Sequence, residues 1–433
     1  MVDCGLYQGL KELRLRNWQP LPIDPKKLET IVLTHAHIDH SGYLPLIAKN
    51  GYDGPILASE PTVELCKILL PDAGYIQEED AKFAAKHGFS KHRNPLPLYT
   101  YDDAVRTLSQ LRAIPDREWY DLSSTVRIML RPSGHILGSR LINCSVKKPH
   151  HHFNIMFVGD IGTYDALIAV DPGAVKSVSY LVLESTYGDR LHTEEDVLAR
   201  IEKIVNRTID RGGKVVIPTF AVGRTQEVLY VLKKLEDKGR LPDVPIYLNS
   251  PLAIDATEIY IKYASEHNFF ENGTAPTKAF SPTRLVQVHD AEESKQLNAL
   301  KEPAIIVSSS GMMTGGRILH HLKAYLPDHK STLVITGFQA AGTRGRSILD
   351  GAKAIKIHGM PVVVNADVEF MDSLSAHADY SDIMRWLGGF EKPPKTTFLV
   401  HGEPKSSEAL KARIEEELGW NVVIPKYLQK FEL

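Results

Sequence analysis

A short buried strand that ends in a dense group of metal-binding side chains constrains the fold more than any other feature. The β-branched run at residues 30–34 predicts the strand, and the loop after it carries His35, His37, Asp39 and His40 within six residues. Imidazoles and carboxylates this close, on an irregular loop where successive side chains turn in different directions, can bind two cations. At a histidine content of about 4%, chance produces this spacing in roughly one chain per thousand of this length. The sequence therefore predicts a metal site here, in preference to a loop of solvated histidines.

Two further candidate ligands also border predicted strands. His135 opens a segment predicted as a strand over residues 135–146, and Asp160 closes one over residues 154–160. Taken singly, each is more often a core or turn residue than a ligand. Because strand ends of one sheet converge on one edge, the three segments together favour a shared site.

Composition limits the class of protein. The chain has 433 residues, 43% of them hydrophobic, which is enough for two or three domains. With a formal charge of −2, a polyanionic ligand must bind in a local groove. Cys4, Cys66 and Cys144 form no C-x-x-C pair, which argues for a reducing compartment and against cysteine-bound zinc. Since no apolar run reaches about 18 residues and no signal peptide begins the chain, we expect a cytoplasmic protein without membrane contact.

The pattern of predicted elements changes along the chain. Closely spaced strands between residues 126 and 160 predict an antiparallel sheet, with a turn at residues 147–152, and residues 80–111 are expected to be helical. Strands and helices alternate from residue 193 to residue 336, which predicts a parallel, doubly wound sheet. We therefore expect an α/β protein with a first domain over residues 1–189, an inserted domain over residues 190–367, and a completion of the first domain over residues 368–433.

These motifs resemble the metallo-β-lactamase superfamily. The histidine loop resembles its signature, the segments ending at His135 and Asp160 resemble its third and fourth motifs, and Asp3 matches its first. The resemblance implies an αββα sandwich in which Asp3 supports the histidine loop without binding metal. It implies one zinc held by His35, His37, His135 and a bridging Asp160, and a second held by Asp39, His40, Asp160 and His401. Family members carry about two dozen residues before this aspartate, so either the start of the sequence is misassigned or the first strands, an edge of the core sheet, are absent.

The inserted segment makes the sequence similar to the β-CASP branch, which processes nucleic acids. Glu184, His377 and His401 match motifs A, B and C of that branch, and a histidine in motif C resembles the RNA-directed members. Stretches beginning at Pro218, Ser310 and Thr336 extend the resemblance over nearly the whole chain. The chain is close to bacterial and archaeal relatives of the cleavage and polyadenylation endonuclease.

The resemblance implies a zinc-dependent ribonuclease acting on single-stranded RNA, with manganese as a substitute metal. Two bound cations supply a hydroxide nucleophile at neutral pH. His377 is the expected general acid, Glu184 the carboxylate that keeps it protonated, and Asp39 both a ligand and a catalytic residue. The long C-terminal domain of RNase J and the N-terminal domain of the archaeal relatives are missing, which favours an endonuclease. A 5′ exonuclease activity and a homodimer stay open.

Small residues and arginines of the insert suggest where RNA could bind. Ser310 and Gly311 belong to a loop that opens a predicted helix, and such a terminus offers free N–H groups to a phosphate, although an empty glycine-rich turn is an equal alternative. Solvated surface charge is the commoner role of a single arginine. The residues proposed for a phosphate track are Arg224, Arg317, Arg344 and Arg346. The histidines at residues 150–152 and 320–321 are expected at the surface.

Three other functions stay open. An ester or thioester hydrolase could share the metal core, but such enzymes lack the insertion. A DNA nuclease is disfavoured because the histidine in motif C, His401, resembles the RNA-directed members. A non-catalytic RNA-binding scaffold is disfavoured because every ligand position is filled.

Overall fold

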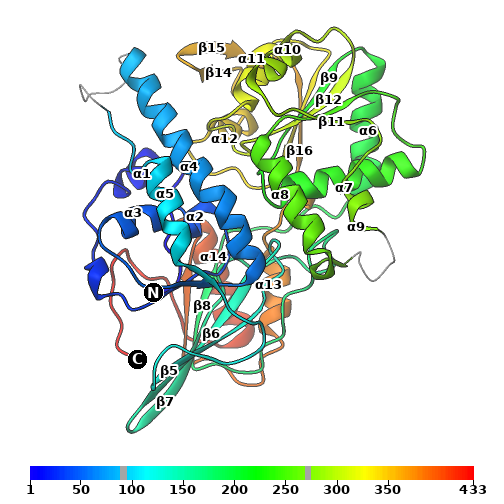
Figure 1. Cartoon of the computed structure of the whole chain (residues 1–433). Coiled ribbons are helices and arrows are strands. Elements are labelled where there is room, and N and C mark those ends of the chain that lie inside the picture. Colours follow the sequence, from blue (N-terminus) through cyan, green and yellow to red (C-terminus); the bar gives the residue numbers. More distant parts are fainter. Residues whose placement is uncertain (88–94, 269–274) are drawn as a thin grey trace. The chain divides into compact units, whose positions relative to one another are not determined.

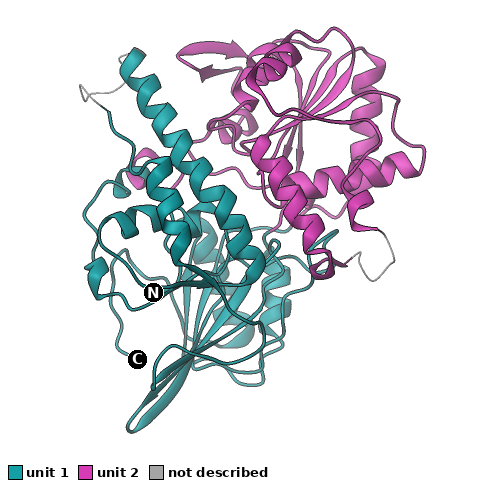
Figure 2. Cartoon of the chain, viewed as in Figure 1, with its two compact units in different colours: residues 1–7, 14–191, 377–433 teal, residues 8–13, 192–376 magenta. Residues whose placement is uncertain are grey.

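The computed structural model describes residues 1–87, 95–268 and 275–433, which form two compact units (Figures 1 and 2). Unit 1 comprises residues 1–7, 14–191 and 377–433, and unit 2 comprises residues 8–13 and 192–376. The short helix α1 (Lys11–Arg16) contains residues of both units. Across the described ranges, every helix is too short or too polar to cross a lipid bilayer.

Unit 1 is built on two sheets. A seven-stranded mixed sheet has the strand order β18-β17-β8-β7-β6-β5-β4, and a three-stranded parallel sheet has the order β1-β2-β3. The strands are β1 (Ile31–Val32), β2 (Ile56–Ala58), β3 (Leu111–Ala113), β4 (Tyr120–Asp121), β5 (Val126–Pro132), β6 (Arg140–Lys148), β7 (His151–Phe157), β8 (Tyr180–Glu184), β17 (Thr396–Val400) and β18 (Val422–Val423). Val32 and Leu57 of the small sheet pack in one buried cluster with Ile128, Leu130 and Ile142 of the large sheet, so the two sheets face each other.

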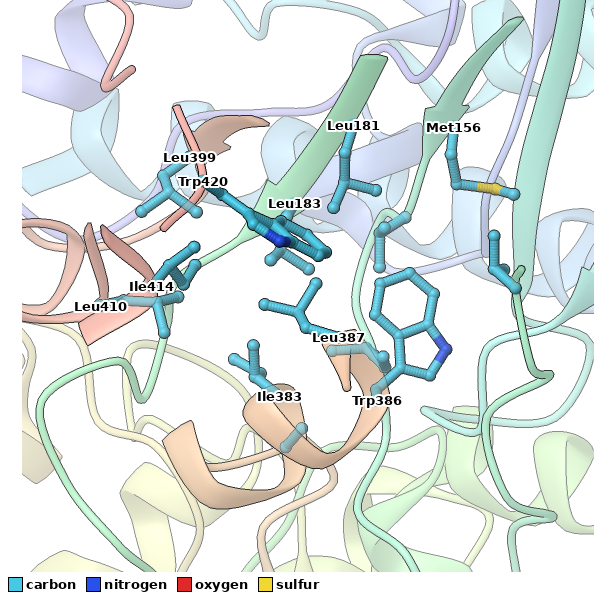
Figure 3. Close-up of a cluster of buried hydrophobic side chains, with 14 of the residues drawn as sticks. Met156, Leu181, Leu183, Ile383, Trp386, Leu387, Leu399, Leu410, Ile414 and Trp420 are labelled. Atoms are coloured by element: carbon cyan, nitrogen blue, oxygen red, sulfur yellow. The ribbon is translucent and has the colours of Figure 1, made fainter. Parts of the chain in front are cut away.

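Helices cover the outer faces of this sandwich. The helices of unit 1 are α2 (Ile38–Ser41), α3 (Leu44–Lys49), α4 (Glu60–His87), α5 (Tyr101–Thr107), α13 (Tyr380–Leu387) and α14 (Pro404–Leu418), and α4 contacts β3. Leu181 and Leu183, alternate residues of β8, point to the face where Trp386 of α13 and Leu410 of α14 pack (Figure 3). Each such side chain contributes about 1.5–3 kcal/mol by burial. The layers helix, sheet, sheet and helix confirm the predicted sandwich.

Unit 2 contains a six-stranded parallel sheet with the order β11-β10-β12-β9-β13-β16. Its strands are β9 (Lys214–Pro218), β10 (Ile246–Leu248), β11 (Leu285–Gln287), β12 (Ala304–Ser308), β13 (Thr332–Thr336) and β16 (Asp367–Met371), with a separate hairpin of β14 (Ala354–Ile357) and β15 (Met360–Val363). Its helices are α6 (Val197–Asp210), α7 (Arg224–Asp237), α8 (Pro251–Lys262), α9 (Pro276–Ala279), α10 (Ala291–Gln296), α11 (Ile318–Tyr325) and α12 (Arg344–Leu349). The predicted parallel sheet is confirmed.

The second boundary of the insert differs from the predicted residue 367. β16 begins at Asp367 and pairs in parallel register with β13, so it adds a strand to the sheet of unit 2. Unit 2 therefore ends at Ala376.

Several predicted element ends in unit 1 were wrong. Residues 135–139 form a loop instead of the start of a strand, since Gly134 and Gly138 turn the chain with φ angles of 78° and 79°, and β6 begins only at Arg140. Asp160 likewise lies in the loop after β7, next to Gly159 at φ 62°. The predicted turn at residues 147–152 narrows to the two residues between β6 and β7. These loops let His135 and Asp160 reach the sheet edge.

The helical prediction for residues 80–111 was only partly right. Helix α4 starts much earlier, at Glu60, and continues through Pro71, a residue that commonly ends a helix. The second helix, α5, begins with a capping box between Thr100 and Asp103, and β3 follows at Leu111. Residues 88–94 lie outside the described residues.

Candidate metal centre

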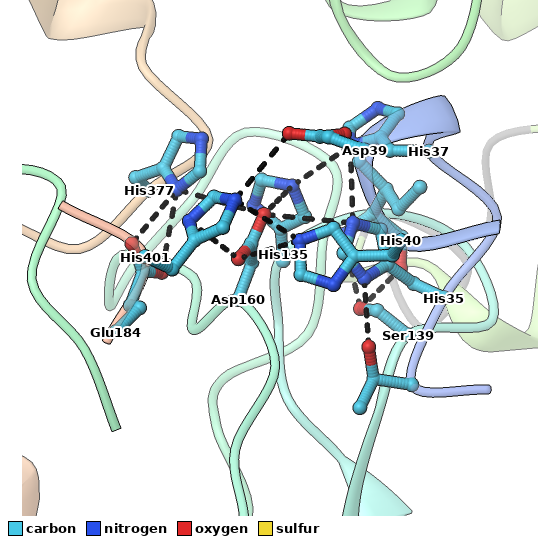
Figure 4. A network of polar contacts seen from close by, with 12 residues as sticks. His35, His37, Asp39, His40, His135, Ser139, Asp160, Glu184, His377 and His401 are labelled. Carbon is cyan, nitrogen blue, oxygen red and sulfur yellow. Dashed lines mark hydrogen bonds and ion pairs between the residues drawn. The ribbon is translucent and has the colours of Figure 1, made fainter. Parts of the chain in front are cut away.

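A first group of buried donor atoms gathers at the strand ends of unit 1 (Figure 4). Nε2 of His35 and Nε2 of His135 each lie 3.2 Å from Nδ1 of His37. The same two atoms lie 3.5 and 3.4 Å from Oδ2 of Asp160. In a tetrahedral zinc site with Zn–N distances of about 2.05 Å, neighbouring ligand atoms are about 3.3 Å apart. These four separations therefore fit a tetrahedral cation.

A second donor group shares Asp160 with the first. Nε2 of His40 lies 3.2 Å from Nε2 of His401 and 3.2 Å from Oδ1 of Asp160. Nε2 of His401 is 3.4 Å from Oδ2 of Asp39. Asp160 thus turns Oδ2 to the first group and Oδ1 to the second, and within the described residues Oδ1 receives no hydrogen bond. A buried carboxylate oxygen that receives no hydrogen bond is suited to be a metal ligand, and one carboxylate could bridge two cations.

Asp3 holds the histidine loop from behind. Its carboxylate accepts hydrogen bonds from the N–H and the Oγ1 of Thr34 and from Nδ1 of His40, each at 2.8 Å. Oγ1 of Thr34 also lies 3.0 Å from Nδ1 of His35. Both imidazoles are thereby fixed with Nε2 directed at the donor groups, a common arrangement around metal-binding histidines. Sequence reasoning missed Thr34, although a hydroxyl directly before the first histidine was an available signal.

Burial and charge set the proton affinity of the cluster. Burial lowers the pKa of His35 well below its ordinary value, and the imidazole of His40 adds to this effect. Burial also disfavours charge on His40, but the carboxylates of Asp160 and Asp3 raise its pKa well above the ordinary value. Burial would raise the pKa of Asp160. The surrounding imidazoles, among which His401 has the largest effect, nevertheless hold that pKa well below its usual range. An ionised carboxylate among imidazoles is a suitable environment for a divalent cation.

Glu184 and His377 form a pair beside the donor groups. Nδ1 of His377 lies 3.1 and 3.3 Å from the two oxygens of Glu184, and the N–H of Ile161 donates to Oε1 at 2.7 Å. Burial lowers the pKa of His377, but Glu184 and then Asp160 outweigh it, so the net pKa is raised. Nδ1 of His377 is 3.9 Å from Oδ2 of Asp160. A protonated imidazole next to the centre is suited to proton transfer.

The four arginines proposed for a phosphate track bind groups of the protein itself. Arg317 donates to the carbonyls of Val288 and His289 and to Oδ1 of Asn249. Arg344 donates to the carbonyls of Met313, Thr314 and Lys356. Arg224 pairs with Glu227, and Arg346 pairs with Asp350. Oγ of Ser310 accepts the N–H groups of Thr314 and Gly315, and Gly311 packs against Phe220. The phosphate track stays a prediction.

The surface prediction for the histidine pair in α11 was half wrong. His320 is exposed, but His321 lies on the inner face of the helix and is fully buried. Its Nε2 accepts from Asn249 and its Nδ1 faces Oδ1 of Asn298 at 2.8 Å. Residues 150–152 are exposed on the hairpin of β6 and β7.

This fold and these two adjoining donor groups define a metal-dependent hydrolase with an inserted α/β unit. Sequence comparison matches residues 1–112 to the Metallo-beta-lactamase superfamily, residues 225–348 to the Beta-Casp domain, and residues 361–425 to the Zn-dependent metallo-hydrolase RNA specificity domain. The chain therefore belongs to the β-CASP family of metal-dependent nucleases within the metallo-β-lactamase superfamily.

Curated relatives agree with this assignment. The chain is 35% identical over 416 residues to Ribonuclease TTHA0252 of Thermus thermophilus, a match that covers 95% of this chain and 89% of that protein. It is 32% identical to Transcription termination factor FttA of Methanosarcina mazei and to that of Pyrococcus abyssi, with 96% and 94% of this chain covered. The chain spans 65% and 62% of the length of these two factors.

Proposed function

We propose that the protein is a zinc-dependent ribonuclease that hydrolyses phosphodiester bonds of single-stranded RNA in RNA processing or decay. The proposed mode is chiefly endonucleolytic, with 5′ exonuclease activity as a second mode. One observation carries the proposal: Asp160 faces two donor groups with its two oxygens, and the Glu184–His377 pair lies beside them. The ribonuclease name of the Thermus thermophilus relative supports RNA as the substrate.

The donor sets suit zinc. His35, His37, His135 and Oδ2 of Asp160 would hold one cation, and Asp39, His40, His401 and Oδ1 of Asp160 would hold the other. Nitrogen and oxygen donors without thiolate fit zinc and also accept manganese. When bound, such a pair supplies a hydroxide nucleophile at neutral pH and neutralises charge on the phosphoryl oxygens.

The remaining residues orient groups and transfer a proton. Glu184 accepts from Nδ1–H of His377, which keeps the imidazole protonated and leaves Nε2–H as its second donor. In the proposed reaction this Nε2–H protonates the departing 3′ oxygen, so the downstream product carries a 5′ phosphate. Asp3 keeps Nε2 of His40 directed at the second group through its bond to Nδ1.

Cleavage of end-labelled substrates tests the proposal. The full chain is stripped with a chelator, reloaded with zinc or manganese, and given single-stranded RNA, the matching DNA, and an RNA duplex, each labelled at either end. We expect internal cuts in single-stranded RNA, 5′-phosphorylated products, and activity only after reloading. RNA binding without cleavage by the reloaded chain would instead support a scaffold. Preferential cleavage of DNA, or hydrolysis of a chromogenic thioester with the RNA intact, would each overturn the proposal.

A further inference from the structure

The hydroxyl group of Thr186 contacts both Glu184, the partner of His377, and His401 of the second donor group. Thr186 lies two residues after Glu184 and is 6% exposed. Its Oγ1 donates a hydrogen bond to Oε2 of Glu184, the partner of His377. The same Oγ1 lies 3.4 Å from Nδ1 and 3.1 Å from the carbonyl oxygen of His401.

Counting protons assigns a direction to each of these contacts. A threonine hydroxyl has one proton to donate and two lone pairs to accept with, whereas an ionised carboxylate can only accept. The carboxylate of Glu184 and the carbonyl oxygen of His401 can both only accept, so they compete for the single proton of Thr186. The carboxylate forms the stronger bond and takes it, and the lone pairs of Oγ1 remain for another donor. Nδ1 of His401 can be that donor if it, and not Nε2, carries the proton of the imidazole ring.

The surroundings of His401 place that proton on Nδ1. Nε2 of His401 lies 3.2 Å from Nε2 of His40 and 3.4 Å from Oδ2 of Asp39, so Nε2 is the nitrogen that faces the second donor group. A histidine that binds a cation through one nitrogen carries its proton on the other and needs an acceptor for it. Oδ1 of Asp160 is also 3.3 Å from Nδ1, but this oxygen faces the second group, which leaves Thr186 as the acceptor outside the donor set.

The backbone at His401 makes such an anchor useful. His401 has a φ of 52°, a conformation that costs free energy for a residue with a Cβ. It follows the last residue of β17, and a Cβ at Gly402 would lie 2.3 Å from Oγ of Ser185, so the chain is tightly confined there. A hydrogen bond to the ring helps to fix its direction on such a backbone.

We propose that Thr186 is a positioning residue that joins the second donor group to His377 through one hydrogen-bonded chain. The chain runs from Nδ1–H of His401 to Oγ1 of Thr186, from the Thr186 hydroxyl to Glu184, and from Glu184 to Nδ1–H of His377. This inference rests on the proposed function, because it takes His401 as a ligand and His377 as the proton donor. Such a chain would link the orientations of His377 and His401, which come from different segments.

Thr186→Val, which keeps the shape and removes the hydroxyl, tests the proposal. We expect kcat on single-stranded RNA to fall about 10- to 100-fold with KM within about twofold, and the affinity for the second cation to fall about 10- to 100-fold. Thr186→Ser, which keeps the hydroxyl, should restore most of both quantities. A merely structural methyl contact would instead favour valine over serine.

The controls separate this inference from the proposed function. Thr208→Val removes another buried hydroxyl, one that bonds to the carbonyl of Ile204 in α6, and should change neither metal affinity nor kcat. Chelator titration of the second cation needs no RNA, so it tests Thr186 even if the wild-type chain cleaves no RNA. Should Thr186→Val fail to fold by circular dichroism, Thr186→Ala takes its place. Wild-type metal affinity and kcat without the hydroxyl, or a serine variant as impaired as the valine variant, would overturn the proposal.

Discussion

Asp3 offers a sharp test of the centre because it reaches the donor groups only through other residues. Its carboxylate accepts three hydrogen bonds of 2.8 Å, two from Thr34 and one from Nδ1 of His40. In Asp3→Asn, the amide oxygen can still accept the N–H of Thr34. The amide NH2 replaces Oδ2 and faces two groups that both donate, the hydroxyl of Thr34 and Nδ1–H of His40.

The magnitude follows from what His40 must then do. If Nδ1 accepts from the new amide, the proton moves to Nε2, the atom 3.2 Å from Oδ1 of Asp160, and Nε2 can no longer bind a cation. If Nδ1 keeps its proton, a side chain only 6% exposed loses its acceptor, which costs about 1–3 kcal/mol. Loss of such an outer partner typically weakens metal binding about 10- to 100-fold, or about 1.4–2.7 kcal/mol.

Competition with a coloured chelator measures this effect. We expect a chelator concentration at which the wild-type chain holds two cations and Asp3→Asn holds one, counted by elemental analysis after gel filtration. Asp24→Asn is the matched control, since exposed Asp24 caps a short helix by accepting the N–H of Lys26, and asparagine caps as well. Two cations retained by Asp3→Asn at that same chelator concentration would refute the reasoning.

Three other changes give separate expectations. His377→Ala should leave the metal content unchanged while the rate of RNA cleavage falls about 100- to 10,000-fold, and retained activity would reject its role as general acid. Gly5→Ala should lower both the melting temperature and the metal content, because a Cβ there would lie 1.5 Å from the carbonyl oxygen of Asp39; an unchanged melting curve would contradict this. Burial lowers the pKa of His321 to about 4, so the folded state resists protonation, and the free energy of unfolding should fall by up to about 3 kcal/mol as pH drops from about 6.5 to 4. Urea titrations at several pH values should show a smaller fall for His321→Gln, and an equal fall in both proteins would contradict the assignment.

Sequence spacing could predict the histidine loop because its four side chains follow one strand within six residues. His401 is different, since it lies 361 residues after His40 and reaches it only because β17 pairs with β8 and ends beside Glu184. No local pattern encodes that pairing, so only the family resemblance pointed to His377 and His401. The histidine loop was therefore predictable from local spacing, whereas His377 and His401 were predictable only from the family resemblance, which also implied the αββα fold.

Other features depend on contacts that a linear sequence does not reveal. Arg317 and Arg344 look like free cations in the sequence, but folding surrounds both guanidinium groups with carbonyl oxygens. Helix α4 continues through Pro71, which local propensity treats as an end. β16 belongs to unit 2 because of its register with β13, and its sequence alone does not specify a partner.

Protons and cations compete for the same nitrogen atoms, and the two donor groups differ in this competition. Partial desolvation opposes charge on His401, whose side chain is 30% exposed, but Asp160 and Asp39 raise its pKa to about 9. The pKa of His40 is also well above its ordinary value. In the metal-free chain both imidazoles are therefore protonated on both nitrogens at neutral pH, and a cation in the second group must displace the Nε2 proton of each. The pKa of His35 is well below its ordinary value, so its lone pair in the first group is already free. As pH rises, the first group should accordingly accept its cation before the second, and the shared Asp160 links the two steps.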